Sequence, residues 1–259
     1  MKQSQAKKRD NAMTNKILMG LIALVLGLLF LEILIVHSKN EQQKNASNQV
    51  QTARIMANGD LLYHDALYMS ALQADGSYDF TENFTYVKPW LKQADLVLGD
   101  FEGTVNPDYP LSGYPLFNAP QSVTAAIKDA GYDVMDLAHN HILDSGLEGA
   151  FTTADAFKKV GIDPIGVYEK PVRDKAPLLI KNVNGIKVAI LSYAYGYNGL
   201  ESNLTDKEVA DHLSNLDEKR MKSRFSVPKK KRISRLSCLR WVLNIVWNRQ
   251  MNRLNSIIR

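Results

Sequence analysis

In its first half the chain reads Ala94-Asp95-Leu96-Val97-Leu98-Gly99-Asp100-Phe101-Glu102-Gly103. The apolar residues 96–98 predict a short buried strand, and the turn that follows them carries two carboxylates. Short apolar runs of this kind alternate with helical patterns downstream of residue 53. This alternation is typical of strand-helix-strand units on a largely parallel sheet. The sequence therefore predicts an α/β fold.

The expected elements follow from the spacing of apolar residues. Strands are expected at 54–58, 96–98, 134–138 and 164–167, and helical patterns cover 84–93, 122–130 and 149–160. Two further strands, 178–183 and 186–193, flank Asn184-Gly185. Because this dipeptide favours a type I′ turn, the chain should add an antiparallel hairpin to the parallel sheet.

Length and composition exclude several classes of protein. A chain of 259 residues with 45% hydrophobic and 23% charged residues is neither disordered nor collagen-like, and it is long enough for one or two packed domains. Its single cysteine, Cys238, excludes a disulfide framework and a cysteine zinc cluster. Any metal must therefore be bound by His, Asp, Glu and Asn side chains.

Polar residues follow three of the expected strands. The first strand ends in Asn58-Gly59-Asp60, the second in residues 99–103, and the third in Ala138-His139-Asn140-His141, with Asp144 close behind. In an open α/β sheet the loops that leave the carboxyl ends of the strands converge on one edge. Carboxylate and amide oxygens beside an imidazole suit Mn, Fe, Zn or Mg, which activate water for attack at phosphorus or carbonyl centres.

Each motif also has a plain structural interpretation. A Gly-Asp pair after a strand is often only a turn, and Glu102 alone could be a solvated loop acid. The His-Asn-His cluster is harder to explain in this way, because buried imidazoles and amides need partners. The repetition at three successive strand ends favours a divalent-metal site. His64 is expected to face solvent or cap a helix.

The N-terminal part predicts a membrane anchor. Residues 17–36 are apolar except for Glu32, and twenty helical residues span the hydrocarbon core of a bilayer. The basic segment 1–16 is expected to stay cytoplasmic, which places the rest of the chain outside the cell. A cleaved signal peptide is the alternative, but the run is too long for one and no cleavage site follows it. Residues 37–52 are expected to form a polar tether, and a domain is expected over 53–220.

These motifs resemble the bacterial capsule-synthesis CapA family, which is known from poly-γ-glutamate capsule systems. Its domain is similar to calcineurin-like metallophosphoesterases. The resemblance implies an α/β/β/α sandwich of metallophosphoesterase type, here incomplete and preceded by one transmembrane helix. It further implies that Asp60, Glu102 and Asn140 are metal ligands and that His141 is the catalytic imidazole, which protonates a leaving oxygen or steadies a phosphate. Asp100, His139 and Asp144 are possible additional site residues.

The sequence departs from the family pattern at several positions. Leu62 stands where phosphoesterases have a histidine, and Asp100 and His139 replace residues that are commonly Asn in the family. A His-x-Gly-x-Glu-like element and a Gly-His-x-His element are expected downstream of residue 220, and the sequence has neither. The metal site is therefore expected to be incomplete and its affinity weak.

The tail 221–259 differs in charge from the rest of the chain. It has 11 of the 32 Lys and Arg residues and none of the 27 acids, so residues 1–220 have 21 basic and 27 acidic side chains. A basic segment that lies on anionic lipid or wall polymer is one interpretation, and a nucleic-acid patch at 229–232 is another. A third is translation out of frame, because a shifted frame restores acids and a Gly-x-Glu-Tyr segment like the missing element. We predict the third.

The sequence leaves three functional hypotheses open. The first is a membrane-anchored extracellular CapA-like protein in the synthesis or export of capsular poly-γ-glutamate, with capsule-polymer synthase components as partners. The second is a metal-dependent phosphoesterase at the cell surface, and the third is an inactive truncated product. The expected substrate is an anionic polymer or a phosphoester, and an extracellular placement excludes nucleic acid as a partner.

Overall fold

The computed structural model describes residues 26–41, 51–172 and 178–217, together with Met19, Leu24, Lys219, Met221 and residues 234–235. The chain divides into two compact units, Met1–Gln51 and Thr52–Arg259. In the first unit residues 26–41 are helical, so the helix continues into the segment 37–52 that we predicted to be a tether.

The predicted membrane anchor is not confirmed. Across the residues that the structure describes, we find no helix that combines the length and the apolar character needed to cross a bilayer. The predicted cytoplasmic segment 1–16 and several residues of the predicted span 17–36 lie outside the described residues.

Two sheets form the centre of the second unit. The first sheet is parallel with the order β1-β2-β3-β4, and its strands are Ile55–Leu62, Leu96–Glu102, Val134–Asp136 and Asp163–Ile165. The second sheet has the order β5-β6-β7, and its strands are Leu179–Val183, Ile186–Ile190 and Ser234–Arg235. Strands β5 and β6 are antiparallel, and β7 pairs parallel to β6. The predicted α/β fold with a parallel sheet is confirmed.

The predicted hairpin turn is also confirmed. Asn184 and Gly185 connect β5 to β6 with φ angles of 51° and 84°. Positive φ at both central residues is what a type I′ turn requires, and Asn and Gly tolerate this conformation best.

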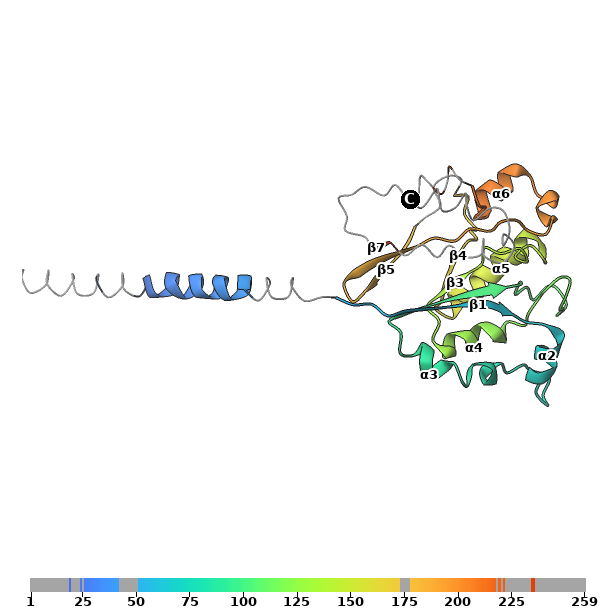
Figure 1. The fold of residues 1–259 in the computed structure, drawn as a ribbon, viewed down its shortest axis with the longest axis horizontal. Coiled ribbons are helices and arrows are strands. Elements are labelled where there is room, and N and C mark those ends of the chain that lie inside the picture. The colour runs from blue at the N-terminus through green and yellow to red at the C-terminus, as the bar shows by residue number, and fades with distance from the viewer. Residues whose placement is uncertain are drawn as a thin grey trace, which may run out of the picture. The chain divides into compact units, whose positions relative to one another are not determined.

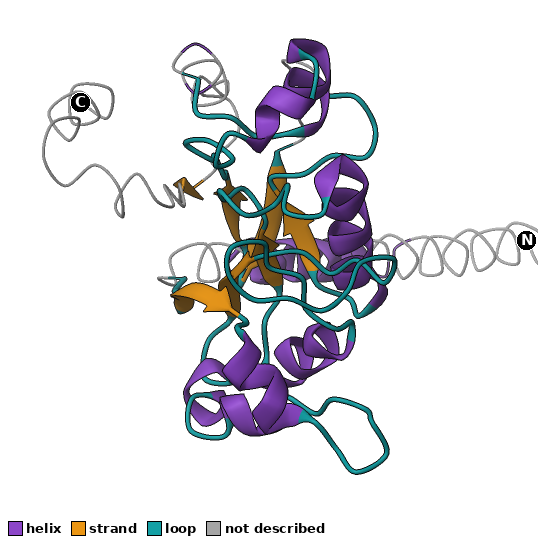
Figure 2. Ribbon diagram, turned by 90° about the vertical axis from the view of Figure 1, so that its right-hand side faces the viewer, coloured by secondary structure: helices purple, strands orange, loops and turns teal. Residues whose placement is uncertain are grey.

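The helices of the second unit are short, apart from two. They are α2 (Asp65–Ala71), α3 (Lys88–Leu91), α4 (Ser122–Ala130), α5 (Gly146–Lys159) and α6 (Asp206–His212), with 3-10 turns η1 (Thr81–Phe84) and η3 (Leu200–Asn203). In Figure 1, α3 and α4 lie below β1, and β5 and β7 lie above it. Figure 2 shows the strands of this unit in orange, gathered between the purple helices.

Alternation along β2 explains these layers. Leu96 and Leu98 pack with Val188 and Ile190 of β6, so one face of the parallel sheet is turned toward the second sheet. We call it the inner face. Val97 belongs to the other large cluster, which contains residues of α4 and α5. Since side chains of a strand alternate between faces, Asp100 and Glu102 lie on the inner face with Leu96 and Leu98.

Gly99 lies on the helix-covered face of the same strand. A Cβ atom at Gly99 would lie 2.7 Å from Cδ1 of Tyr132 and 2.8 Å from Cε of Met135. Glycine therefore lets the buried Tyr132 ring approach the backbone of β2 directly before Asp100.

The boundaries of β1 differ from the prediction in a way that matters for the site. The apolar pattern predicted that β1 ends at Asn58, whereas the strand continues to Leu62 and contains Asp60. The register between β1 and β2 shifts between Ala57 and Asp60, and pairing then resumes as far as Glu102. A backbone irregularity of this kind adds residues without ending the strand, so a local pattern does not reveal it.

Candidate functional site

Three aspartates lie in register across the parallel sheet near the carboxyl ends of its strands. Asp60 of β1 is paired with Asp100 of β2, and Asp100 with Asp136 of β3. Asp100 and Asp136 are buried, whereas Asp60 is exposed. The inner face therefore changes from apolar to acidic along the strands, at the edge where the loops emerge.

The Asp136 carboxyl is buried and is held between the two sheets. Asp136 accepts hydrogen bonds from the Ala138 amide and from the Ser192 hydroxyl, which follows β6. Burial raises the pKa of Asp136 to about 7, although both hydrogen bonds act in the opposite direction. This contact joins the two sheets directly below the site.

The carboxyls of Asp60 and Glu102 form a pair that lies closer to solvent. Burial raises the pKa of Glu102 to about 7, and the hydrogen bond and negative charge of the Asp60 carboxyl act in the same direction. The nearby His141 lowers the pKa of Glu102 and does not compensate fully. Two carboxyls brought together in this way favour either a shared proton or a cation between them.

The turn after β3 supplies two imidazoles and an amide. His139 is buried, its Nδ1 accepts from the His141 amide at 3.0 Å, and its Nε2 lies 3.4 Å from the Gly103 amide nitrogen. Burial lowers the pKa of His139 to about 3, so this imidazole is neutral. Since Nδ1 accepts from the His141 amide, the proton of the neutral ring is on Nε2, so His139 stabilises the turn and is poorly placed to bind a metal.

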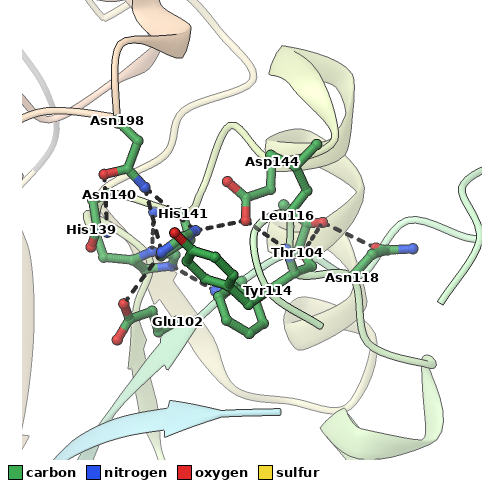
Figure 3. Close-up of polar contacts among 12 residues, drawn as sticks. Glu102, Thr104, Tyr114, Leu116, Asn118, His139, Asn140, His141, Asp144 and Asn198 are labelled. Atoms are coloured by element: carbon green, nitrogen blue, oxygen red, sulfur yellow. Dashed lines mark hydrogen bonds and ion pairs between the residues drawn. The ribbon is translucent and has the colours of Figure 1, made fainter. Parts of the chain in front are cut away.

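His141 has a different environment. Its Nδ1 lies 2.7 Å from Oδ2 of Asp144, and its Nε2 lies 3.9 Å from Oε1 of Glu102 (Figure 3). The Phe117 ring packs edge-to-face against the imidazole, with 4.8 Å between the ring centroids and an angle of 88° between the ring planes. A carboxylate only accepts hydrogen bonds, so Nδ1 donates to Asp144 and Nε2 is left for proton exchange on the Glu102 side.

The loop after β2 is held by a buried polar network. Asn118 accepts from the Thr104 hydroxyl and from the Asn106 amide, and its Nδ2 donates to the carbonyl oxygens of residues 106, 109 and 110. Phe117 donates its amide to Oδ2 of Asp144 at 2.6 Å. This network fixes the Phe117 ring that packs on His141.

A cavity of about 410 Å³ opens above the strand ends. One wall contains Asp60, Glu102, His139 and Asn140, and the other is formed by residues 193–199 and Glu201, which follow β6. Four predicted site residues therefore line one cavity, with His141 in reach of Glu102. Asp100 and Asp144 are not among the described residues that line it, and Asp144 instead contacts His141 from the opposite side.

The wall formed by residues 193–199 was missed by the sequence analysis. Tyr195, Asn198 and Glu201 line the cavity, and Asn198 contacts both Asn140 and His141. A signal for them exists, because Asn198-Gly199 is a polar pair that follows a predicted strand, as at the other three strand ends. That strand was predicted only as the second arm of the hairpin around Asn184-Gly185.

The donor set suits a divalent metal only in part. Among the described residues there is no group of three or more His, Cys, Asp or Glu side chains that could hold a metal ion. The Asp60 and Glu102 carboxyls do meet at the cavity, and the Asn140 amide lies beside them on its wall. The residues present thus fit a weakly held cation, with two carboxylates and one amide oxygen as its protein ligands.

Comparison with known proteins identifies the family. A family model described as bacterial capsule synthesis protein PGA_cap matches residues 54–239. The chain belongs to this family. The match includes the whole parallel sheet and extends past residue 220, where we predicted that the domain ends.

Two relatives of this chain agree with its assignment to the PGA_cap family. The chain is 35% identical over 115 residues to the capsule biosynthesis protein CapA of Bacillus anthracis, which is 42% of this chain and 28% of that protein. It is 25% identical over 189 residues to the PGA biosynthesis protein CapA of Bacillus subtilis (strain 168), which is 72% of this chain and 48% of that protein. The chain thus matches less than half the length of each relative.

Proposed function

We propose that this chain is a membrane-anchored, extracellular component of capsular poly-γ-glutamate synthesis or export, with a divalent-metal site at the strand ends of its parallel sheet. The relative in Bacillus subtilis is named a PGA biosynthesis protein, and this name supports poly-γ-glutamate as the polymer in the proposal. The observation that supports the metal most strongly is the pair of Asp60 and Glu102 carboxyls at one cavity with the Asn140 amide.

The finer fold that we propose is the α/β/β/α sandwich of metallophosphoesterases. The order of helices, parallel sheet and second sheet in the described residues supports it. The site at the carboxyl edge of the parallel strands, on the side facing the second sheet, supports it as well.

Asp60, Glu102 and Asn140 would hold the metal through their side-chain oxygens. When bound, a divalent metal such as Mn, Fe, Zn or Mg would polarise a phosphoryl or carbonyl oxygen and activate water. Asp144 orients His141 through Nδ1, so that Nε2 can give a proton to a leaving oxygen. Phe117 excludes water from one side of that ring.

The charge of the cavity limits what can bind there unaided. No Lys or Arg is among the described residues that line it, whereas Asp60, Glu102 and Glu201 are. An anionic polymer or a phosphoester would therefore be repelled unless a metal neutralises this wall. This argues that polymer binding and metal binding depend on each other.

Metal binding and phenotype test the proposal. We expect the full-length chain to bind Mn²⁺, and Glu102→Gln to weaken that binding at least tenfold. We also expect the wild-type gene, but not the Glu102→Gln variant, to restore capsular polymer in a strain that lacks it. Normal polymer with Glu102→Gln would contradict a role for the metal, and failure of the wild type to restore it would contradict the capsule function.

Phosphoesterase activity is the second candidate function, favoured by the Asp144-His141 contact. It predicts hydrolysis of a generic phosphodiester in the presence of Mn²⁺, abolished by His141→Ala. Polymer restored without any turnover would favour a scaffold role, and the absence of both effects would favour an inactive product. Protease accessibility of the domain in intact cells tests the extracellular placement, and cross-linking tests the synthase partners.

A further inference from the structure

We propose that Asn198 is a positioning residue, whose amide orients the Asn140 and His141 side chains from the opposite wall of the cavity. The inference rests on the proposed metal site in one respect, since it explains how Asn140 would present an oxygen ligand. The contacts on which it depends lie within the protein itself (Figure 3).

The first contact sets the orientation of the Asn140 amide. Its Nδ2 donates to Oδ1 of Asn198 at 3.3 Å. The two ends of a carboxamide diverge, so the Asn140 oxygen is the end that Asn198 does not engage. Metals bind the oxygen of an amide and not its nitrogen, and Asn140 lines the cavity. Asn198 thus selects the orientation in which Asn140 can act as a ligand.

The second contact explains why the Asn198 amide itself is not reversed. Its Nδ2 lies 3.5 Å from Nδ1 and 3.4 Å from Nε2 of His141. An atom almost equidistant from both nitrogens cannot lie along the in-plane bonding direction of either, so it lies over the face of the ring. An N–H group is attracted to an aromatic face, whereas a carbonyl oxygen is repelled by it. The His141 ring therefore keeps Oδ1 of Asn198 turned toward Asn140.

The backbone around Asn198 keeps the amide in this place. Asn198 and Gly199 both have positive φ, at 55° and 84°, a conformation that Asn and Gly tolerate better than other residues. The preceding Tyr197 is 1% exposed, and its carbonyl accepts from the Leu200 amide at 2.9 Å. A buried ring and a tight turn thus anchor Asn198 on the segment that follows β6.

His141 is consequently restrained from several directions. Asp144 contacts Nδ1 at 2.7 Å, the Phe117 ring packs edge-to-face against the imidazole, and Asn198 lies over its face. Asp144 and Phe117 come from the loops of the first sheet, whereas Asn198 follows β6 of the second. The site is complete only when the two sheets are packed together.

Two variants and a control test the inference in the full-length chain. Asn198→Gly removes the amide and retains the left-handed backbone, whereas Asn198→Asp retains an oxygen for Asn140 and loses the N–H over His141. Asn203→Ala, at an exposed asparagine of η3, is the control. The measurements are the side-chain ¹⁵N–¹H resonances of Asn140 and His141 in metal-free protein, and the Mn²⁺ dissociation constant.

We expect Asn198→Gly to shift both sets of resonances and to weaken Mn²⁺ binding about 10- to 100-fold. Asn198→Asp should shift the His141 resonances more than those of Asn140, and Asn203→Ala should change nothing. Unchanged resonances in Asn198→Gly, with Mn²⁺ affinity within about twofold of wild type, would overturn the inference. If the wild type binds no Mn²⁺, the proposed metal site fails, and the metal-free resonances still decide the role of Asn198.

Discussion

The Asp144 carboxylate holds the His141 ring at 2.7 Å between Oδ2 and Nδ1, and the same oxygen accepts the Phe117 amide at 2.6 Å. The three residues come from two different loops, the one after β2 and the turn after β3. Because the carboxylate is buried, it both orients the imidazole and ties the two loops together.

Replacing this carboxylate should destabilise the domain. Asp144→Ala leaves the buried Phe117 amide without that acceptor, which should lower the free energy of unfolding by about 1–3 kcal/mol. Urea denaturation measures the change. Asp155→Ala is the control, because Asp155 is exposed and pairs with Lys158 at 3.3 Å, a contact that should contribute less than about 1 kcal/mol. Equal effects of the two substitutions would contradict the structural role of Asp144.

Glu102→Gln should separate stability from metal binding. Removing the charge beside Asp60 relieves a repulsion, so we expect the metal-free variant to be more stable than wild type near pH 8. Each kcal/mol gained in the free energy of unfolding should raise Tm by about 2–4 °C. The rise in Tm on adding Mn²⁺ should be lost in the same variant. Thermal unfolding with and without Mn²⁺ measures both effects. A lower metal-free Tm would show that Glu102 is structurally required.

The free energy of unfolding of the domain should fall as pH rises, because of the Asp136 carboxyl. Its pKa is raised to about 7 in the folded state from 3.8, so the folded protein binds more protons than the unfolded chain between about pH 4 and 7. The stabilisation from this proton is present below about pH 4 and is lost as pH rises through 7. Asp136→Asn should make that decline shallower, and Asp155→Asn should leave it unchanged. Unfolding free energies measured across this range give the slopes.

The close approach of Tyr132 to Gly99 predicts that a larger residue at this position destabilises the domain. Gly99→Ala should lower the free energy of unfolding by about 1–3 kcal/mol, because its Cβ would overlap the Tyr132 ring in a packed core. Gly196→Ala is the matched control, since its nearest neighbour would be Oε1 of Glu201 at 3.6 Å. Chemical denaturation compares the two. A neutral Gly99→Ala would mean that Tyr132 can move away from β2 without loss of packing.

Much of the fold could be predicted from local patterns. The helix predicted at 122–130 has those bounds in the structure, and β3, β4, β5 and β6 each start within one residue of the predicted position. The ends of strands were less predictable: β1 continues to Leu62 because it pairs with β2 beyond an irregularity in register. Helix α6 was not predicted, although its capping box of Thr205 and Glu208 is a signal that the sequence contains.

The sequence could predict which residues belong to the site, but not what each of them contacts. That Asp60, Glu102, Asn140 and His139 would share one edge followed from polar residues after parallel strands, and they line one cavity. Their individual roles depend on contacts that spacing does not encode. His139 accepts from the His141 backbone amide, and Asp144 contacts His141 and does not line the cavity.

The sequence by itself determined the family, the parallel sheet and the edge at which chemistry can take place, because apolar periodicity and strand-end polar residues act locally along the chain. Tertiary structure alone decided which carboxyls meet, which imidazole is kept neutral and which residue faces them from the second sheet. The physical reason is that burial and charge around Glu102, His139 and His141 are set by neighbours far away in the chain: Asp60 acts on His139 across 79 positions, and Asn198 contacts His141 across 57.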